Sequence, residues 1–131
     1  MSAVGAVFPL HCTANGKAIL AALPPEAVRE VLPARLERFT ASTITKLADL
    51  TRELDTIRET GVAFDREEHT HGISAGGIAV SDAFGRLAAL SVPMPTQRFR
   101  GRECAIAREL TAVLDHIVEA GYKSAVRSAL R

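Results

Sequence analysis

Apolar side chains recur at helical spacing in the middle of the chain and predict an amphipathic helix over residues 45–60. Charged residues separate the apolar positions, which follow a 3–4–3 spacing. These positions are Leu47, Leu50, Leu54 and Ile57. Gly61 stands where a glycine in the left-handed conformation commonly ends a helix. The pattern therefore predicts both the buried face of this helix and its C-terminal end.

The first third of the chain predicts two shorter helices. Residues 17–23 are mostly apolar and end at a pair of prolines. Pro25 suits the first turn of a second helix, since its missing N–H has no partner there in any case. Val28, Val31 and Leu32 share one face of that helix, and Pro33 stops it. Before both helices, residues 6–10 form a short strand or an extended entry segment.

The second half begins with strand-like segments. Residues 62–65 predict a short strand, and residues 73–80 predict a longer one. Two glycines within the longer strand indicate that another part of the backbone approaches it closely. Residues 86–92 complete a β-hairpin with it, and the run Pro93-Met94-Pro95 is expected to end the hairpin.

A long amphipathic helix over residues 101–120 follows the hairpin. Its predicted apolar stripe consists of Ile106, Leu110, Val113, Leu114, Ile117 and Val118. The order of helices, strand, hairpin and helix predicts an α+β domain with an antiparallel sheet covered by helices. About four strands are expected, one of them very short, so the sheet is expected to be incomplete.

Composition indicates one soluble globular domain spanning residues 1–131. Hydrophobic residues make up 47% of the chain and charged residues 24%, with a net charge of +1. Acidic and basic residues are interspersed, which disfavours a DNA-binding face on this chain. The start lacks a basic leader, and no apolar run reaches the ~18 residues of a membrane helix. We therefore expect a cytoplasmic protein with no membrane contact, and Cys12 and Cys104 reduced and mostly buried.

Two segments carry candidate chemistry. Residues 13–17 precede a helix, where free N–H groups and the helix dipole favour a carboxylate or phosphate, although Thr13 also suits a plain helix cap. Residues 64–71 concentrate carboxylates and histidines, which could supply a general base or metal ligands. For His69 and His71 we favour a solvated, charged connection, because a metal site usually needs three protein ligands and the sequence offers no strong third partner. Ser91 ends an apolar strand, and its hydroxyl either bonds to the backbone or points into a pocket.

The order of several motifs resembles the effector-binding domain of the IclR family of transcription regulators. Residues 9–21 (PLHCTANGKAILA) are similar to the signature of that family. Residues 38–40 and 43–45 resemble its "R-Y/F-T…T-I-T" stretch. Residues 50–69 and 88–92 resemble its "L…EL…R-x-x-G-Y-A-x-D-x-E-E" and "AALSVSGP" segments. The resemblance runs from about residue 6 to 120.

The resemblance implies a fold and a function. The fold is GAF-like (profilin-like), with an antiparallel sheet flanked by helices and possibly incomplete at its N-terminal strands. The function is to sense a small-molecule effector, often a carboxylate or an aromatic acid, within a dimer or tetramer. It implies no catalysis, cofactor or metal. It also implies that DNA is contacted only through an N-terminal winged helix-turn-helix domain that this chain lacks.

The resemblance also implies which positions contact the ligand. They are the helix start at Ala14 and Asn15, the strand-end carboxylate Asp65, the small residue Ala75, and Ser91 with Pro93 on the last long strand. Pro93 replaces a serine of the family motif and removes a hydroxyl and a backbone N–H. A larger or more apolar effector is therefore expected. Because Asp65 would repel a carboxylate, the effector should also carry a hydrogen-bond donor.

Two alternatives remain open on the sequence. One is an enzyme that uses Asp65, Glu67, His69 and His71, with or without a metal. The other is a purely structural oligomerisation module whose pocket is filled by side chains, to which Pro93 and Met94 could contribute.

Overall fold

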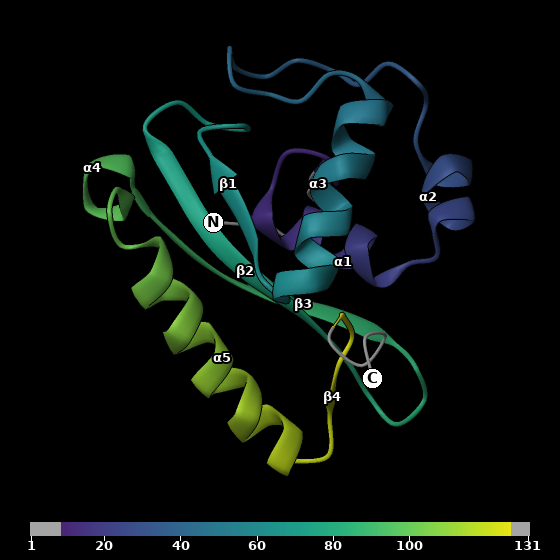
Figure 1. The fold of residues 1–131 in the computed structure, drawn as a ribbon, viewed down its shortest axis with the longest axis vertical. Coiled ribbons are helices and arrows are strands. Elements are labelled where there is room, and N and C mark those ends of the chain that lie inside the picture. The colour runs from purple at the N-terminus through teal and green to yellow at the C-terminus, as the bar shows by residue number, and fades with distance from the viewer. Residues whose placement is uncertain (1–8, 127–131) are drawn as a thin grey trace, which may run out of the picture.

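A computed structural model describes residues 9–126 of the chain (Figure 1). Within this range the helices and strands are α1 (Ala14–Ala22), α2 (Pro25–Val31), α3 (Leu47–Thr60), β1 (Ala63–Arg66), β2 (Ile73–Ser81), β3 (Leu87–Pro95), α4 (Thr96–Phe99), α5 (Glu103–Glu119) and β4 (Lys123–Ser124). The predicted entry segment at residues 6–10 lies mostly outside the described residues. The predicted α+β class is confirmed.

The strands form one antiparallel sheet in the order β1-β2-β3. β3 occupies one edge of β2 along its whole length, and the register pairs Ile73 with Pro95 and Ser81 with Leu87. β1 and the two-residue β4 both pair with β2, at opposite ends of the strand. Because β3 already occupies one edge of β2, β1 and β4 share the other.

Helices cover both faces of this sheet, α5 on one and α1 on the other, and α3 packs against α1 (Figure 1). Side chains alternate between the faces along each strand. Ile78 and Val80 therefore pack with Ile106, Leu110 and Leu114 of α5. Ala63 and Ala79 belong to the second core cluster, which includes buried residues of α1, α2 and α3.

Two adjacent glycines let a helix approach β2 from each side. A Cβ on Gly76 would lie 2.8 Å from the Ile106 side chain of α5, and a Cβ on Gly77 would lie 3.1 Å from Ala14 of α1. Both distances are shorter than ordinary van der Waals contacts. The predicted close approach to this strand is thus confirmed, and it places the start of α1 directly on the sheet.

The caps of the two main helices on that face agree with the sequence. The Thr13 hydroxyl accepts a hydrogen bond from Gly16 N at 3.0 Å, so α1 begins at Ala14, three residues before the predicted start. The helix at 45–60 is α3, and Gly61 ends it in the left-handed conformation with φ of 83°. The predicted buried positions Leu50, Leu54 and Ile57 are buried.

The predicted end of the hairpin was wrong, because β3 continues through both prolines to Pro95. The hydrogen bond from Thr96 N to Gly72 O shows which residues of β3 direct their backbone N–H and C=O groups toward β2. In the antiparallel register these are the even-numbered residues. Pro93 and Pro95 are odd-numbered, so the positions of their missing N–H groups point away from β2. Proline is tolerated at such edge positions because no bond within the sheet is lost.

Three predictions about burial were also wrong. Val31 is 54% exposed, because only Val28 of α2 reaches the core. Val113 and Val118 of the predicted α5 stripe are exposed, because the predicted stripe is wider than the face of the helix that the sheet covers. Cys104 is exposed, whereas Cys12 is buried, and both are free thiols.

The short elements α4 and β4 were not predicted. Within residues 9–126 no helix is long and apolar enough to span a bilayer.

Candidate functional site

A cavity of about 660 Å³ lies between the start of α1 and the sheet. We call it the α1–sheet cavity. All six predicted site residues line it: Ala14, Asn15, Asp65, Ala75, Ser91 and Pro93. They come from α1, β1, β2 and β3, and the register places Asp65, Ala75 and Pro93 side by side across three strands. The volume falls within the ~300–1,000 Å³ typical of small-molecule sites.

The first turn of α1 provides hydrogen-bond donors at one end of the α1–sheet cavity. Thr13 is already engaged, since its hydroxyl donates to Pro9 O and accepts from Gly16 N. The backbone N–H groups of Ala14 and Asn15 have no partner among residues 9–126. The Asn15 amide is exposed and also has no partner within that range. The positive end of the helix dipole adds to these donors, so this end favours an anionic group.

Asp65 provides an acceptor elsewhere in the cavity wall. Its carboxylate is buried, and Oδ1 accepts a hydrogen bond from Glu68 N at 2.8 Å. Burial raises the pKa of Asp65, while hydrogen bonds from the Glu68 and His69 backbone and the charge of Lys17 oppose that rise. A buried carboxylate in this setting favours a ligand group that donates a hydrogen bond to it.

The β3 side of the α1–sheet cavity contributes one hydroxyl and one proline ring. Ser91 is half-buried, and its hydroxyl has no partner within residues 9–126. Of the two interpretations of Ser91, the structure therefore fits the one in which the hydroxyl faces a pocket and not the one in which it bonds to the backbone. Pro93 lies beside it with an apolar ring. This wall thus combines one polar group with apolar surface.

The loop after β1 closes another side, and it separates the two histidines. His69 lines the α1–sheet cavity and lies against the Phe39 ring, with 5.2 Å between ring centroids. His71 is almost fully exposed and lies 3.3 Å from Glu67. The two histidines therefore do not form one site, and residues 9–126 contain no cluster suited to a metal ion. The α1–sheet cavity brings together Asp65 and His69, whereas Glu67 and His71 do not line it.

Lys17 and Glu68 lie in the two candidate segments of the sequence, but the sequence did not indicate that they pair directly behind the α1–sheet cavity. Lys17 has no exposed side-chain surface, and its ammonium donates to both oxygens of Glu68, at 2.8 and 2.9 Å. It also contacts Glu53 and the backbone oxygen of Phe64. Burial raises the pKa of Glu68, whereas the charge and hydrogen bond of Lys17 lower it. The sequence signals were the lysine of the family signature and the glutamates of the stretch at residues 50–69, and neither indicates which residues are in contact.

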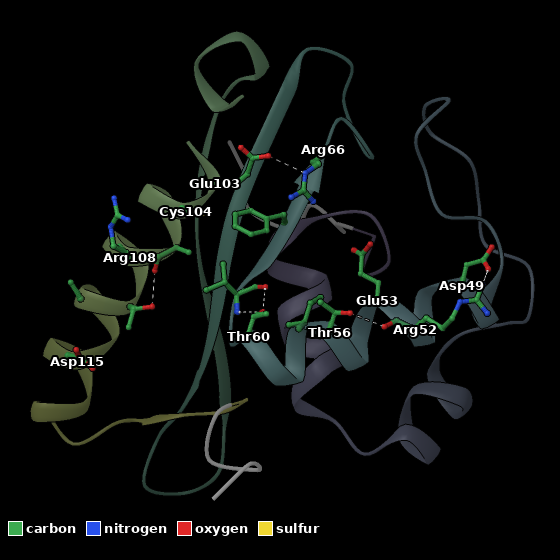
Figure 2. A pocket seen from close by; sticks show the side chains of 16 residues that line it. Asp49, Arg52, Glu53, Thr56, Thr60, Arg66, Glu103, Cys104, Arg108 and Asp115 are labelled. Carbon is green, nitrogen blue, oxygen red and sulfur yellow. Dashed lines mark hydrogen bonds and ion pairs between the residues drawn. The ribbon is translucent and has the colours of Figure 1, made fainter. Parts of the chain in front are cut away.

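A second hollow, of about 1060 Å³, lies between α3 and α5 beside β1 (Figure 2). We call it the α3–α5 groove. Its floor includes Ile57, Val62 and Phe64, and charged side chains of both signs surround it. Arg66 of β1 reaches toward Glu103 of α5 across it, at 3.7 Å (Figure 2). None of the six predicted site residues lines this groove, although it is the larger hollow.

Fold and site together define an α+β domain with one helix-covered sheet and a cavity that combines helix-start donors with a buried carboxylate. The chain matches the family described as "Bacterial transcriptional regulator IclR C-terminal" over residues 1–120. It belongs to this family. The family resemblance found in the sequence is therefore confirmed.

Curated relatives carry the names of transcriptional regulators. The chain is 55% identical over 112 residues to the HTH-type transcriptional regulator Rv1719 of Mycobacterium tuberculosis, covering 86% of this chain and 43% of that protein. It is 40% identical over 97 residues to the HTH-type transcriptional repressor AllR of Klebsiella pneumoniae, covering 72% and 36% respectively. The chain thus spans less than half the length of these relatives. They are regulators rather than enzymes, as the resemblance implied.

Solved structures with similar folds include sensing domains of the same family. The C-terminal domain of the E. coli transcriptional regulator KdgR aligns with a TM-score of 0.70 at 36% identity, covering 79% of this chain and 65% of that one. The inducer-binding domain of PobR from Acinetobacter, a double mutant in complex with 3-hydroxybenzoic acid, aligns with a TM-score of 0.69 at 29% identity, covering 82% and 65%.

Proposed function

We propose that this chain is the effector-binding part of an IclR-type transcription regulator and that its ligand occupies the α1–sheet cavity. The single observation that carries the proposal is the convergence of the six predicted residues on that cavity. Its free volume also opposes a purely structural module, in which side chains would fill the pocket. DNA contact belongs, in this proposal, to a part of the regulator outside this chain.

The effector class follows from the groups that line the α1–sheet cavity. The N–H groups of Ala14 and Asn15, which have no partner within residues 9–126, favour a carboxylate, and Asp65 favours a hydrogen-bond donor. Apolar side chains of Pro9, Leu10, Ile19 and Ile73 line the same space. We therefore propose a small organic acid that carries both an apolar body and a hydroxyl or amino group. The PobR domain bound to 3-hydroxybenzoic acid supports this class by analogy.

A thermal-shift screen followed by calorimetry tests the proposal. The probes are 3-hydroxybenzoate, benzoate, the methyl ester of 3-hydroxybenzoate and aliphatic hydroxy acids. A binding acid should raise the melting temperature, since a ligand at 100 times its Kd stabilises by about 2.7 kcal/mol. Removal of the hydroxyl or esterification of the carboxylate should weaken binding.

Three variants locate the binding site. Asn15→Leu and Asp65→Ala should each abolish the shift, whereas Asp115→Ala, an exposed carboxylate in the α3–α5 groove, should retain it. A shift lost in Asp115→Ala but kept in the other two would place the ligand in the groove instead. No shift with any acid in the set would count against the proposal.

We also propose that the chain self-associates, as its family resemblance implies. Among residues 9–126, β3 is an edge strand, and its Leu90 and Val92 are each 43% exposed on the face that α5 covers in part. Exposed apolar side chains on a free strand edge are typical of contacts with another chain.

A further inference from the structure

The α1–sheet cavity and the α3–α5 groove are separated by a single strand. On β1, Asp65 lines the cavity, whereas its neighbours Phe64 and Arg66 line the groove. This alternation follows from the pleat of a strand, which directs successive side chains to opposite faces. A displacement of β1 therefore changes the walls of both hollows at once.

A buried ion cluster connects β1 to α1, which lines the cavity, and to α3, which lines the groove. Lys17 lies on α1, one turn after Ala14 of the cavity wall, and its side chain has no exposed surface. Its ammonium contacts Glu68 after β1, the Phe64 backbone oxygen on the outer edge of β1, and Glu53 of α3. Glu53 itself lines the α3–α5 groove (Figure 2).

Hydrogen bonds and ion pairs thus form a continuous path from one hollow to the other. Glu68 N donates to the cavity residue Asp65, the Glu68 carboxylate accepts from Lys17, and Lys17 contacts Glu53. A ligand donor that engages Asp65 competes for the carboxylate to which Glu68 N is bonded. Because a buried ammonium cannot lose a carboxylate partner without a large penalty, Lys17 and its partners should shift together.

We propose that Lys17 is a positioning residue for the α1–sheet cavity and that the path Asp65–Glu68–Lys17–Glu53 transmits occupancy of the cavity to the α3–α5 groove. This inference rests on the proposed function of the cavity. Glu53 is the member of the cluster that can respond most readily, since its side chain is 34% exposed and that of Glu68 only 8%. The groove is accordingly the surface on which an effector changes the regulator.

Cys104 provides a reporter in the α3–α5 groove. It is exposed there, whereas Cys12 is fully buried. Burial, with the charges of Asp65 and Glu68, raises the pKa of the Cys12 thiol to about 12, so that thiol stays protonated and unreactive at neutral pH. An environment-sensitive fluorophore attached through a thiol reaction should therefore label Cys104 alone.

The experiment measures two quantities on the labelled full chain during a titration with 3-hydroxybenzoate or the best acid from the screen. Calorimetry gives the Kd, and the fluorescence of the label on Cys104 reports changes in the environment of the α3–α5 groove. In the wild type both should give the same midpoint. In Glu53→Gln the Kd should stay within about fivefold, because Glu53 does not line the cavity and the amide oxygen of glutamine can still accept a hydrogen bond from Lys17. The fluorescence response should fall by more than half in that variant.

A matched control is Asp55→Asn, which alters an exposed carboxylate of α3 that pairs with Arg58 and lies outside the cluster. It should keep both Kd and fluorescence response. Binding heat without a change at Cys104 in the wild type, or an unchanged response in Glu53→Gln, would overturn the inference alone. Absence of binding heat for every acid would overturn the proposed function, and this inference with it.

Discussion

Lys17 is the residue on which the stability of the interior around the α1–sheet cavity depends most. Its ammonium is fully buried among two carboxylates and one backbone oxygen, and no buried side-chain nitrogen or oxygen of the cluster lacks a partner. Isolated charges are expensive to bury, and a paired cluster reduces that penalty. The same lysine closes the outer edge of β1 at Phe64, while Glu68 accepts from Arg66 N on that edge.

Replacement of this lysine should destabilise the fold strongly. Lys17→Met leaves the buried Glu68 carboxylate without its cation and should lower the free energy of unfolding by about 3–5 kcal/mol. Urea denaturation measures the change. Lys46→Met, at an exposed lysine, serves as the control and should differ by less than about 0.5 kcal/mol. Equal stabilities of the two variants would contradict the role assigned to the cluster.

Asp65 should make stability depend on pH. Burial raises its pKa above the ordinary 3.8, so the folded state binds a proton more readily than the unfolded chain. The stabilising contribution is therefore fully present below pH 3.8 and is lost as pH rises through the raised folded pKa. Glu68 acts in the same direction, because burial also raises its pKa.

The variant Asp65→Asn isolates this contribution, because the amide oxygen can still accept from Glu68 N. At neutral pH the variant should be more stable than the wild type, by a few degrees in melting temperature. The difference should shrink as pH falls toward 3.8. Denaturation of both proteins from pH 4 to 8 measures it. A difference that does not vary with pH would show that Asp65 is not responsible.

At the scale of elements, α1 is held against its surroundings by contacts that leave no room for a methyl group. A Cβ on Gly16 would lie 2.4 Å from the backbone oxygen of Leu10, and one on Gly77 would lie 3.1 Å from Ala14. Backbone atoms cannot move aside as a flexible side chain can. Since Ala14 and Asn15 are the start of this helix, its close packing also positions the donors of the cavity.

Gly16→Ala should therefore be costly in two ways. The clash with Leu10 should lower the free energy of unfolding by about 1–3 kcal/mol, and the displaced helix start should weaken binding of the acid. Gly77→Ala, with a longer closest contact, should be the milder change. Denaturation and calorimetry on both variants test this order. A milder effect of Gly16→Ala would contradict the tight packing of Gly16 against Leu10.

At the scale of the whole molecule, the two outer edges of the sheet are protected to different extents against pairing with another strand. The outer edge of β1 is occupied by the side chains of Lys17 and Glu68. On β3, Pro93 and Pro95 remove two outward donors, which hinders pairing at that end of the strand. Among residues 9–126, the other end of β3, near Leu87 and Leu90, has no such protection, and we propose that it takes part in self-association.

Leu90→Lys should weaken the proposed self-association, because a charge on the exposed β3 face opposes its burial. Analytical ultracentrifugation over a range of concentrations measures the shift toward monomer. Phe84→Lys is the control, since Phe84 is 83% exposed in the turn between β2 and β3, away from the strand edge. Equal weakening by both substitutions would indicate nonspecific apolar association rather than a contact through β3.

The sequence alone determined the features that depend on neighbours along the chain. The spacing of Leu50, Leu54 and Ile57 and the position of Gly61 predicted α3, because helical periodicity and a left-handed cap are local properties. Ordered motifs predicted the family. Through the resemblance they also predicted the residues that the structure brings together in the α1–sheet cavity.

Tertiary structure decided the features that depend on partners far away in sequence. Glu53 and Glu68 lie 36 and 51 residues from Lys17, so no local pattern could predict a buried lysine there. β3 runs through its prolines because their missing donors face the free edge, which only the pairing with β2 establishes. Val113 is exposed because the sheet covers only part of the apolar face of α5. Burial and pairing are properties of the assembled layers, and periodicity alone cannot supply them.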